Sequence, residues 1–143
     1  MKQFTRPDLV NRDLTKGGFT YLAIMWSQQE GMRPTDYHVD GFCTRPHHTP
    51  DGTLLTVAGA YGPNWTATLA EMQRWLQQPS VGYTPDGDAP GLREHELLIR
   101  WATLEERQAR RQAAAERQAV RRAEERRQQA EQEAEAAGQS ALF

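Results

Sequence analysis

The apolar positions of this chain are concentrated in its first hundred residues and almost vanish afterwards. From Leu104 to Ala137 the sequence consists of Ala, Glu, Gln and Arg, with Leu104 and Val120 as the exceptions and with no Gly or Pro. Nearly all of these residues favour a helix. At about 1.5 Å per residue they predict a helix on the order of 50 Å long. Gly138 is the residue type that commonly ends helices, so we expect the helix to end there.

This helix is expected to start before its polar part. Apolar residues recur at helical spacing over residues 97–104, directly after the breaker-rich residues 85–91. The pattern predicts a helix that begins near Leu92 or Arg93 and packs its first turns on the globular part. Beyond Leu104 the stripe fades to Ala, which buries little area, so a stable coiled coil is not expected from this helix alone. Association of several chains through the helix stays an alternative.

The apolar segments ahead of the helix predict both helix and strand. Residues 19–30 place apolar side chains on one side of a helix that Gly31 would end, although a buried strand is the competing interpretation. Residues 37–44 and 53–61 flank the turn-rich residues 45–52, which predicts a β-hairpin with a long loop.

A second short helix is expected after the hairpin. Thr68 and Glu71 form a capping box, which predicts a helix over residues 68–78 with one apolar face. The chain is therefore expected to be α+β: a small head with a β-hairpin and two short helices, followed by a long solvent-exposed C-terminal helix.

Three parts follow from these elements. We expect an α+β globular head over residues 1–102, a long polar Ala/Arg/Glu/Gln helix over residues 103–137, and a C-terminal peptide over residues 138–143. A chain of 143 residues has room for one core.

Composition narrows the class of protein further. Residues 1–102 carry nine Lys and Arg against eleven Asp and Glu, a balance that does not indicate nucleic-acid binding by the head. The single Cys43 cannot close an intramolecular disulfide, and the first residues lack the pattern of a signal peptide. No apolar run approaches the roughly 20 residues of a membrane span. These features predict a cytoplasmic protein without a membrane partner.

Arginine dominates the first two thirds of the predicted helix. A row of arginines there can serve as a cationic rod for phosphate backbones, which makes weak or indirect DNA contact a possible function. The alternative is an ordinary solvated helix face, which the interleaved Glu residues and the acidic end favour. The candidate nucleic-acid contacts are Arg107, Arg110, Arg111, Arg117, Arg121, Arg122, Arg126 and Arg127.

A metal or catalytic site is not expected in the head. His38, Cys43, His47 and His48 are zinc-ligand types, but an odd spacing along a strand points His38 and Cys43 to opposite faces, and no Cys-x-x-Cys pair exists. The chain holds no nucleophile elbow and no phosphate-cradling glycine loop. We therefore expect no metal, no cofactor and no enzymatic activity. Among the tryptophans, Trp65 is expected to be the most exposed, because it follows a turn.

The C-terminal residues form a compact peptide anchor. Gln139, Leu142 and Phe143 offer one amide for orientation and two apolar side chains for a pocket. This ending resembles the pentapeptide with which bacterial replication and repair proteins bind the DNA polymerase sliding clamp, usually Gln, Leu, Ser or Asp, Leu, Phe. Ser140 and Ala141 depart from that pattern, which predicts weaker binding.

The resemblance implies a function for the whole chain. Leu142 and Phe143 would enter the apolar pocket of the clamp, and Gln139 would bind the adjacent polar subsite. The expected function is a non-enzymatic adaptor or regulator in replication, repair or the maintenance of a bacterial or phage mobile element. The alternatives are a nucleic-acid-binding protein that uses the Arg-rich helix, and a structural or oligomeric protein that associates through it.

Overall fold

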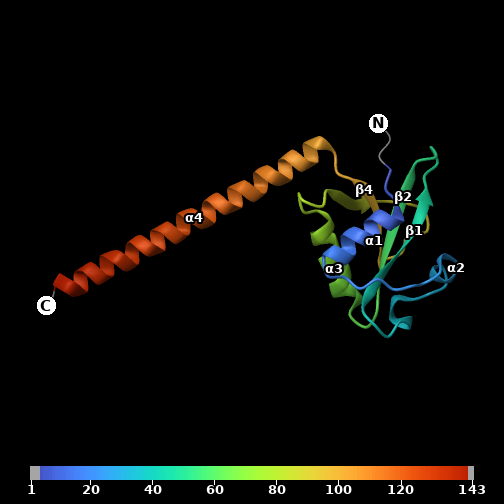
Figure 1. Cartoon of the computed structure of the whole chain (residues 1–143), viewed down its shortest axis with the longest axis horizontal. Helices are drawn as coiled ribbons and strands as arrows, with labels where there is room; N and C mark the ends of the chain where they lie inside the picture. Colours follow the sequence, from blue (N-terminus) through green and yellow to red (C-terminus); the bar gives the residue numbers. More distant parts are fainter. Residues whose placement is uncertain (1–3, 142–143) are drawn as a thin grey trace. The chain divides into compact units, whose positions relative to one another are not determined.

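The computed structural model describes the backbone of residues 4–141 and the side chains of residues 4–138. The chain divides into two units, Met1–Thr103 and Leu104–Phe143. The first is an α+β unit with a four-stranded antiparallel sheet, and the second is one long helix, as the sequence predicts (Figure 1). None of the helices in the described residues has the length and apolar composition that a bilayer crossing requires.

The sheet is built around the predicted hairpin. Strands β1 (Gly41–His48) and β2 (Leu54–Tyr61) pair in antiparallel register from Gly41 opposite Tyr61 to His48 opposite Leu54. The hairpin is confirmed, but its loop is shorter than predicted, because residues 45–48 belong to β1. Strand β4 (Glu96–Trp101) pairs with β2, and β3 (Tyr83–Gly87) pairs with β4, giving the order β1-β2-β4-β3.

Both outer strands of the sheet contain a proline. Phe42 exchanges backbone hydrogen bonds with Thr20 and Leu22 on the outer side of β1, so the alternate residue Pro46 also has its backbone facing outward. At that position the missing N–H of proline leaves no ladder bond unmade. On the other edge, Pro85 lies in the irregular stretch of β3 between Thr84 and Gly87.

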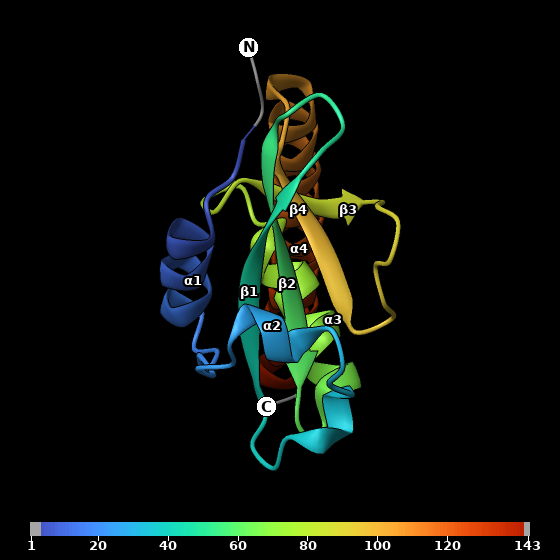
Figure 2. The same cartoon turned by 90° about the vertical axis from the view of Figure 1, so that its right-hand side faces the viewer.

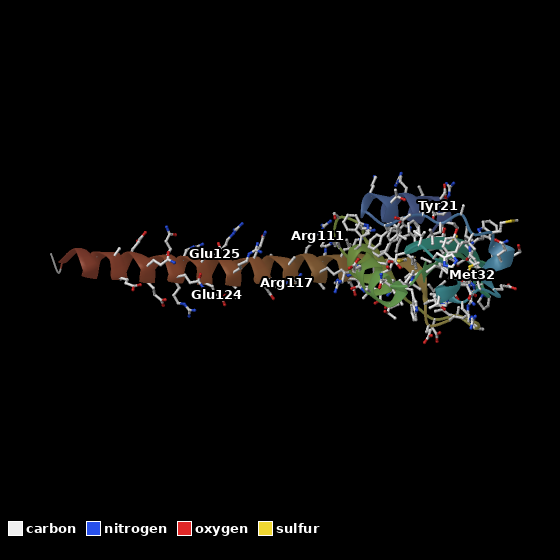
Figure 3. The ribbon with its side chains drawn as sticks, turned by 90° about the horizontal axis from the view of Figure 1, so that it is seen from below. Tyr21, Met32, Arg111, Arg117, Glu124 and Glu125 are labelled. Atoms are coloured by element: carbon white, nitrogen blue, oxygen red, sulfur yellow. The ribbon has the colours of Figure 1, made fainter. Side chains whose placement is uncertain are left out.

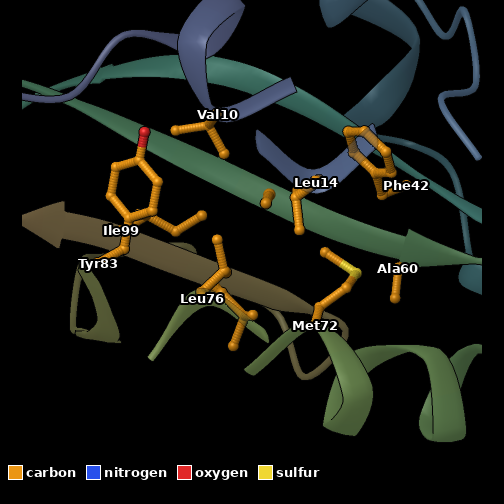
Figure 4. Packing of buried hydrophobic residues seen from close by; sticks show 10 residues of the cluster. Val10, Leu14, Phe42, Ala60, Met72, Leu76, Tyr83 and Ile99 are labelled. Atoms are coloured by element: carbon orange, nitrogen blue, oxygen red, sulfur yellow. The ribbon is translucent and has the colours of Figure 1, made fainter. Parts of the chain in front are cut away.

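Two helices cover one face of the sheet. Helix α1 (Pro7–Lys16) contributes Val10 and Leu14, and α3 (Trp65–Leu76) contributes Met72 and Leu76. These side chains meet residues of the strands, among them Ile99, in a fully buried core (Figure 4). Each pair is spaced by four residues, so each helix turns one narrow apolar stripe to the sheet.

The other face of the sheet is covered by the segment between α1 and β1. This segment contains the short helix α2 (Trp26–Gln29) and the 3₁₀ turn η1 (Pro34–Asp36) (Figure 2). It packs Leu22 and Ile24 against Cys43 and Tyr61 in a smaller cluster. The helix predicted over residues 19–30 is therefore wrong except at its end. Tyr21 instead forms a single parallel bridge with Phe42.

Other local predictions also need correction. Helix α3 begins at Trp65 rather than at a Thr68 cap, because the Asp40 carboxylate accepts hydrogen bonds from the Asn64 backbone (2.8 Å) and side chain (2.9 Å) and fixes the entry of the helix earlier. The predicted helix start near Leu92 or Arg93 is wrong, because residues 96–101 form β4. The helix α4 spans Leu104–Ala141, so it continues through Gly138.

Candidate partner-binding sites

The three residues of the clamp-like motif lie at the limit of the described chain. Leu142 and Phe143 are outside the described residues, and so is the side chain of Gln139. The backbone of Gln139 lies in the last turn of α4. The structure therefore establishes what precedes the motif: every side chain from residue 115 to residue 138 is exposed.

The eight arginines of the second unit all lie on α4, where the sequence places them. Arg110 and Arg107 near the start of the helix are partly buried, and Arg110 is 3.9 Å from the Glu106 carboxylate. The remaining six are exposed, and Figure 3 labels Arg111 and Arg117 among them. They are Arg111, Arg117, Arg121, Arg122, Arg126 and Arg127.

The zinc-type residues of the head do not converge. His38 and His48 are exposed, whereas Cys43 is buried and donates its thiol to the Ile24 carbonyl at 3.3 Å. Within residues 4–141 no three His, Cys, Asp or Glu side chains are placed to hold a metal ion. Burial raises the pKa of Cys43, although nearby carbonyls and Arg45 oppose that effect. A thiol held in this way is a poor nucleophile.

A buried ion-pair network crosses the second face of the sheet. Glu96 of β4 is fully buried and accepts from Arg45 of β1 and from Arg93, whose Nε is 3.4 Å away. Gly59 of β2 lies opposite both Cys43 and Glu96, so no side chain there blocks the Arg45 guanidinium from reaching across β2. Burial alone would raise the pKa of Glu96, but the hydrogen bond and charge of Arg45, with those of Arg93, outweigh it and lower the pKa.

The same network fastens the covering segment to the sheet. Arg93 donates to the backbone carbonyls of Gln29 and Met32, the latter at 2.7 Å. The buried Gln29 amide in turn donates to the carbonyls of Ile24 (3.2 Å) and Thr44 (3.3 Å). Because all of these groups are paired with one another, the network has a structural role that holds residues 24–32 in place.

Two buried polar groups near this network have no hydrogen-bond partner in the described part of the chain, Tyr61 Oη and His95 Nε2. Their rings lie edge to face at 5.2 Å, and the Trp65 ring meets His95 in the same manner at 6.3 Å. Burial lowers the pKa of His95, and burial followed by the charge of Glu96 raises the pKa of Tyr61 to about 12. Both groups are therefore neutral at neutral pH.

The segment between α1 and β1 exposes an apolar patch that the sequence analysis did not predict. Tyr21, Met25 and Trp26 are half or more exposed, and they line an open surface pocket of about 610 Å³. The remaining pocket residues are Ala23, Ile24 and Ser27. Exposed apolar groups that cluster in this way are typical of interaction surfaces.

The tryptophans explain why the patch was missed. Trp26 lies in an apolar run that is typical of a core helix, yet it is 59% exposed. Trp65, expected to be the most exposed, is partly buried and packs against the core formed with α3. The sequence carries no signal for the patch, because the buried Gln29 amide fixes this segment only through its contact with the Ile24 carbonyl in the folded chain.

Comparisons with known proteins add no relative. No family model, no curated protein and no solved structure matches this chain.

Proposed function

We propose that this chain is a non-enzymatic adaptor that docks on the bacterial DNA sliding clamp through Gln139, Leu142 and Phe143. The observation that carries the proposal is the Gln-x-x-Leu-Phe peptide, which begins in the last turn of a helix whose side chains are exposed from residue 115 to residue 138. A short linear motif acts only where a receptor can reach it, and an exposed helix without an apolar face supports such access.

The helical backbone of Gln139 sets one requirement for docking. Clamp-binding peptides of the resembled class insert two apolar side chains and an amide into neighbouring subsites, a linear-peptide mode. The last turn of α4 must then unwind. Its final four carbonyls have no partner within the helix, so unwinding there costs little free energy.

The helix also separates the motif from the head along the chain. The 38 residues of α4 rise about 57 Å from first to last. A clamp-bound motif therefore leaves the head tethered, so that whatever the head binds is held at a raised local concentration near the replication machinery.

The test measures binding of the full-length protein to a purified bacterial sliding clamp. We expect saturable binding by the natural protein and loss of at least about tenfold when Leu142 and Phe143 are both changed to Ala, since two apolar side chains leave a pocket. Gln139→Ala should also weaken binding, whereas Gln132→Ala, an exposed amide on the same helix, serves as the matched control and should bind normally.

A gain-of-function variant sharpens this test. Ser140→Leu restores the residue usual at that motif position and should tighten binding by about tenfold, the effect of roughly 1.4 kcal/mol from burying a leucine in part. Absence of clamp binding by the natural protein, or binding that Leu142→Ala and Phe143→Ala leave unchanged, would overturn the proposal.

A further inference from the structure

The first half of α4 separates its residues by charge. At about 100° per residue, eight positions between residues 107 and 122 fall within roughly 140° of the helix circumference. Six of the eight are Arg, and the other two are Ala114 and Gln118. We name this side the arginine face; its arginines are Arg107, Arg110, Arg111, Arg117, Arg121 and Arg122.

The opposite side of the same turns carries no cation. It is rich in alanine, and its one acidic residue is Glu116, about 180° from Arg107 around the helix. The interleaved glutamate that dilutes the charge when the sequence is read linearly therefore points away from the arginines. The helical conformation thus places six arginines of a mixed segment on one side and its single carboxylate on the other.

The arginine face is accessible over most of its length. Arg111, Arg117, Arg121 and Arg122 are all exposed, and Figure 3 draws side chains that project around α4. The acidic cluster that begins at Glu131 lies about 15 Å along the axis from Arg121, which exceeds the screening length of about 10 Å. Glu125 shares the azimuth of the face at its C-terminal border, and Glu135 shares that of Arg117 about 27 Å farther along the axis.

Like charges in rows four residues apart destabilise an isolated helix. Arg117 and Arg121 form such a pair. Ala114 lies on the same face, four residues after Arg110 and three before Arg117, where a glutamate would relieve the repulsion. An anionic ligand that runs along the helix removes this repulsion on binding.

We infer that the arginine face binds the phosphate backbone of double-stranded DNA without reading its sequence. The face is straight and about 22 Å long, and duplex DNA presents one phosphate charge per roughly 1.7 Å and stays straight over that distance. Residues 104–141 contain no aromatic residue on which unpaired bases could stack, which disfavours single strands.

Membrane binding is a weaker fit for this surface. A helix that lies in a membrane interface needs large apolar side chains opposite its cations. Here the opposite side offers Ala residues and Val120.

The inference is independent of clamp docking and is tested on the full-length protein by fluorescence anisotropy. The probe is a labelled mixed-sequence duplex of about 20 base pairs, titrated between roughly 50 and 200 mM salt. With four arginines in contact, the logarithm of the binding constant should fall against the logarithm of salt with a slope of roughly −3.6. Variants with Leu142→Ala and Phe143→Ala should bind the duplex as the natural protein does.

Matched double variants locate the contact. Arg117→Gln with Arg121→Gln should lower the magnitude of the salt slope by about 2. Arg126→Gln with Arg127→Gln removes the same charge outside the face and should change the slope by less than half as much. Gln and Arg have similar helix propensities, so helicity by circular dichroism should be equal in all of them.

Three results would overturn the inference. The first is duplex binding that is absent or independent of salt, and the second is an equal effect of the two double variants. The third is tighter binding of a single-stranded probe or of anionic vesicles than of the duplex, measured under the same conditions.

Discussion

The two units of this chain are ordered by different forces. The head depends on contacts between residues far apart in sequence: Val10 of α1, Met72 of α3 and Ile99 of β4 are each fully buried in one core. Helix α4 holds its one β-branched residue, Val120, 60% exposed. Its conformation therefore depends on local propensity, whereas the head depends on tertiary packing. A substitution should accordingly have very different effects in the two units.

The chain offers a convenient way to observe each unit separately. All four tryptophans lie in the head, at positions 26, 65, 75 and 101, and residues 104–143 contain none. Tryptophan fluorescence during urea unfolding thus reports on the head, while far-ultraviolet circular dichroism also includes the large helical signal of α4. The two signals measured on the full-length protein therefore distinguish unfolding of the head from unfolding of α4.

The largest effect is expected at the buried ion-pair network. Glu96→Ala leaves the Arg45 and Arg93 guanidinium groups without their shared carboxylate and should lower the free energy of unfolding of the head by about 3–5 kcal/mol. Asp86→Ala, which removes a 60% exposed partner of Arg100, is the control and should cost at most about 1 kcal/mol. Similar urea midpoints for the two variants would contradict the buried network.

Truncation of a core side chain should have the next largest effect. A truncation in one unit should not change the stability of the other unit. Ile99→Ala removes a fully buried side chain from the core and should cost about 2–5 kcal/mol in the fluorescence-detected transition. Val120→Ala on α4 should leave that transition unchanged, because the side chain is exposed. A shift of the tryptophan transition by Val120→Ala would show that the helix stabilises the head.

Two substitutions of glycine by alanine should change stability in opposite directions. A Cβ at Gly17 would lie 2.7 Å from the Trp75 ring, so Gly17→Ala should destabilise the head by about 1–3 kcal/mol. A Cβ at Gly138 meets nothing within 4 Å, and Gly138→Ala should stabilise α4 by at most about 1 kcal/mol. The checks are the urea midpoint for Gly17→Ala and helicity at 222 nm for Gly138→Ala. A stabilised Gly17→Ala head would mean that the contact with Trp75 does not exist.

The stability of the head is also expected to depend on pH. Burial lowers the pKa of His95 below 6.5. Just below pH 6.5 the imidazole is therefore protonated in the unfolded chain and neutral in the folded chain. The contribution of His95 to stability is complete above pH 6.5 and is lost as the pH falls below it, by at most about 1.4 kcal/mol per pH unit. The lowered pKa of Glu96 adds a further loss only below about pH 4.5. Urea titrations at several pH values should reveal both steps.

A His95→Gln variant separates the two steps. It should remove the loss between pH 6.5 and 4.5 and keep the loss at lower pH, whereas His48→Gln, at an exposed position, should keep both. Residues 104–143 contain no histidine, so the helicity of α4 should not follow the first step.

The same contrast explains which elements could be predicted. The α4 helix follows from composition, because each of its residues favours the same conformation. The hairpin follows from the turn residues Pro50, Asp51 and Gly52, and Gly52 has the positive φ of 82° that such a turn requires. Both elements are therefore determined by residues close together in the sequence.

Elements that depend on distant partners could not be predicted in the same way. Leu97, Leu98 and Ile99 are buried on alternate faces of β4, and a strand covered on both faces has the continuous apolar pattern that also suits a helix. Strand β3 contains Pro85 and Gly87, which indicate a turn. Its conformation is set by pairing with β4.

Helix α1 is a different case. It was not predicted from the sequence, although Pro7 at its start and the spacing of Val10 and Leu14 are ordinary helix signals.

The candidate sites divide along the same line. The arginine face follows from the spacing of Arg residues once α4 is taken as a continuous helix, so the sequence contains it. The exposed patch at Tyr21, Met25 and Trp26 does not follow from the sequence, because its exposure depends on Gln29 and Arg93 fixing that segment on the sheet. The apolar character of a residue in the sequence does not tell whether its side chain is buried in the core or exposed on the surface.

The prolines in the two outer strands of the sheet affect how its edges can associate with other molecules. A β-sheet whose rims offer uninterrupted donors and acceptors can template strands from neighbouring molecules and grow into fibrils. Pro46 removes a donor on one rim, and Pro85 disrupts the ladder on the other. Both rims of the head are therefore poor templates for edge-to-edge pairing with strands of neighbouring molecules.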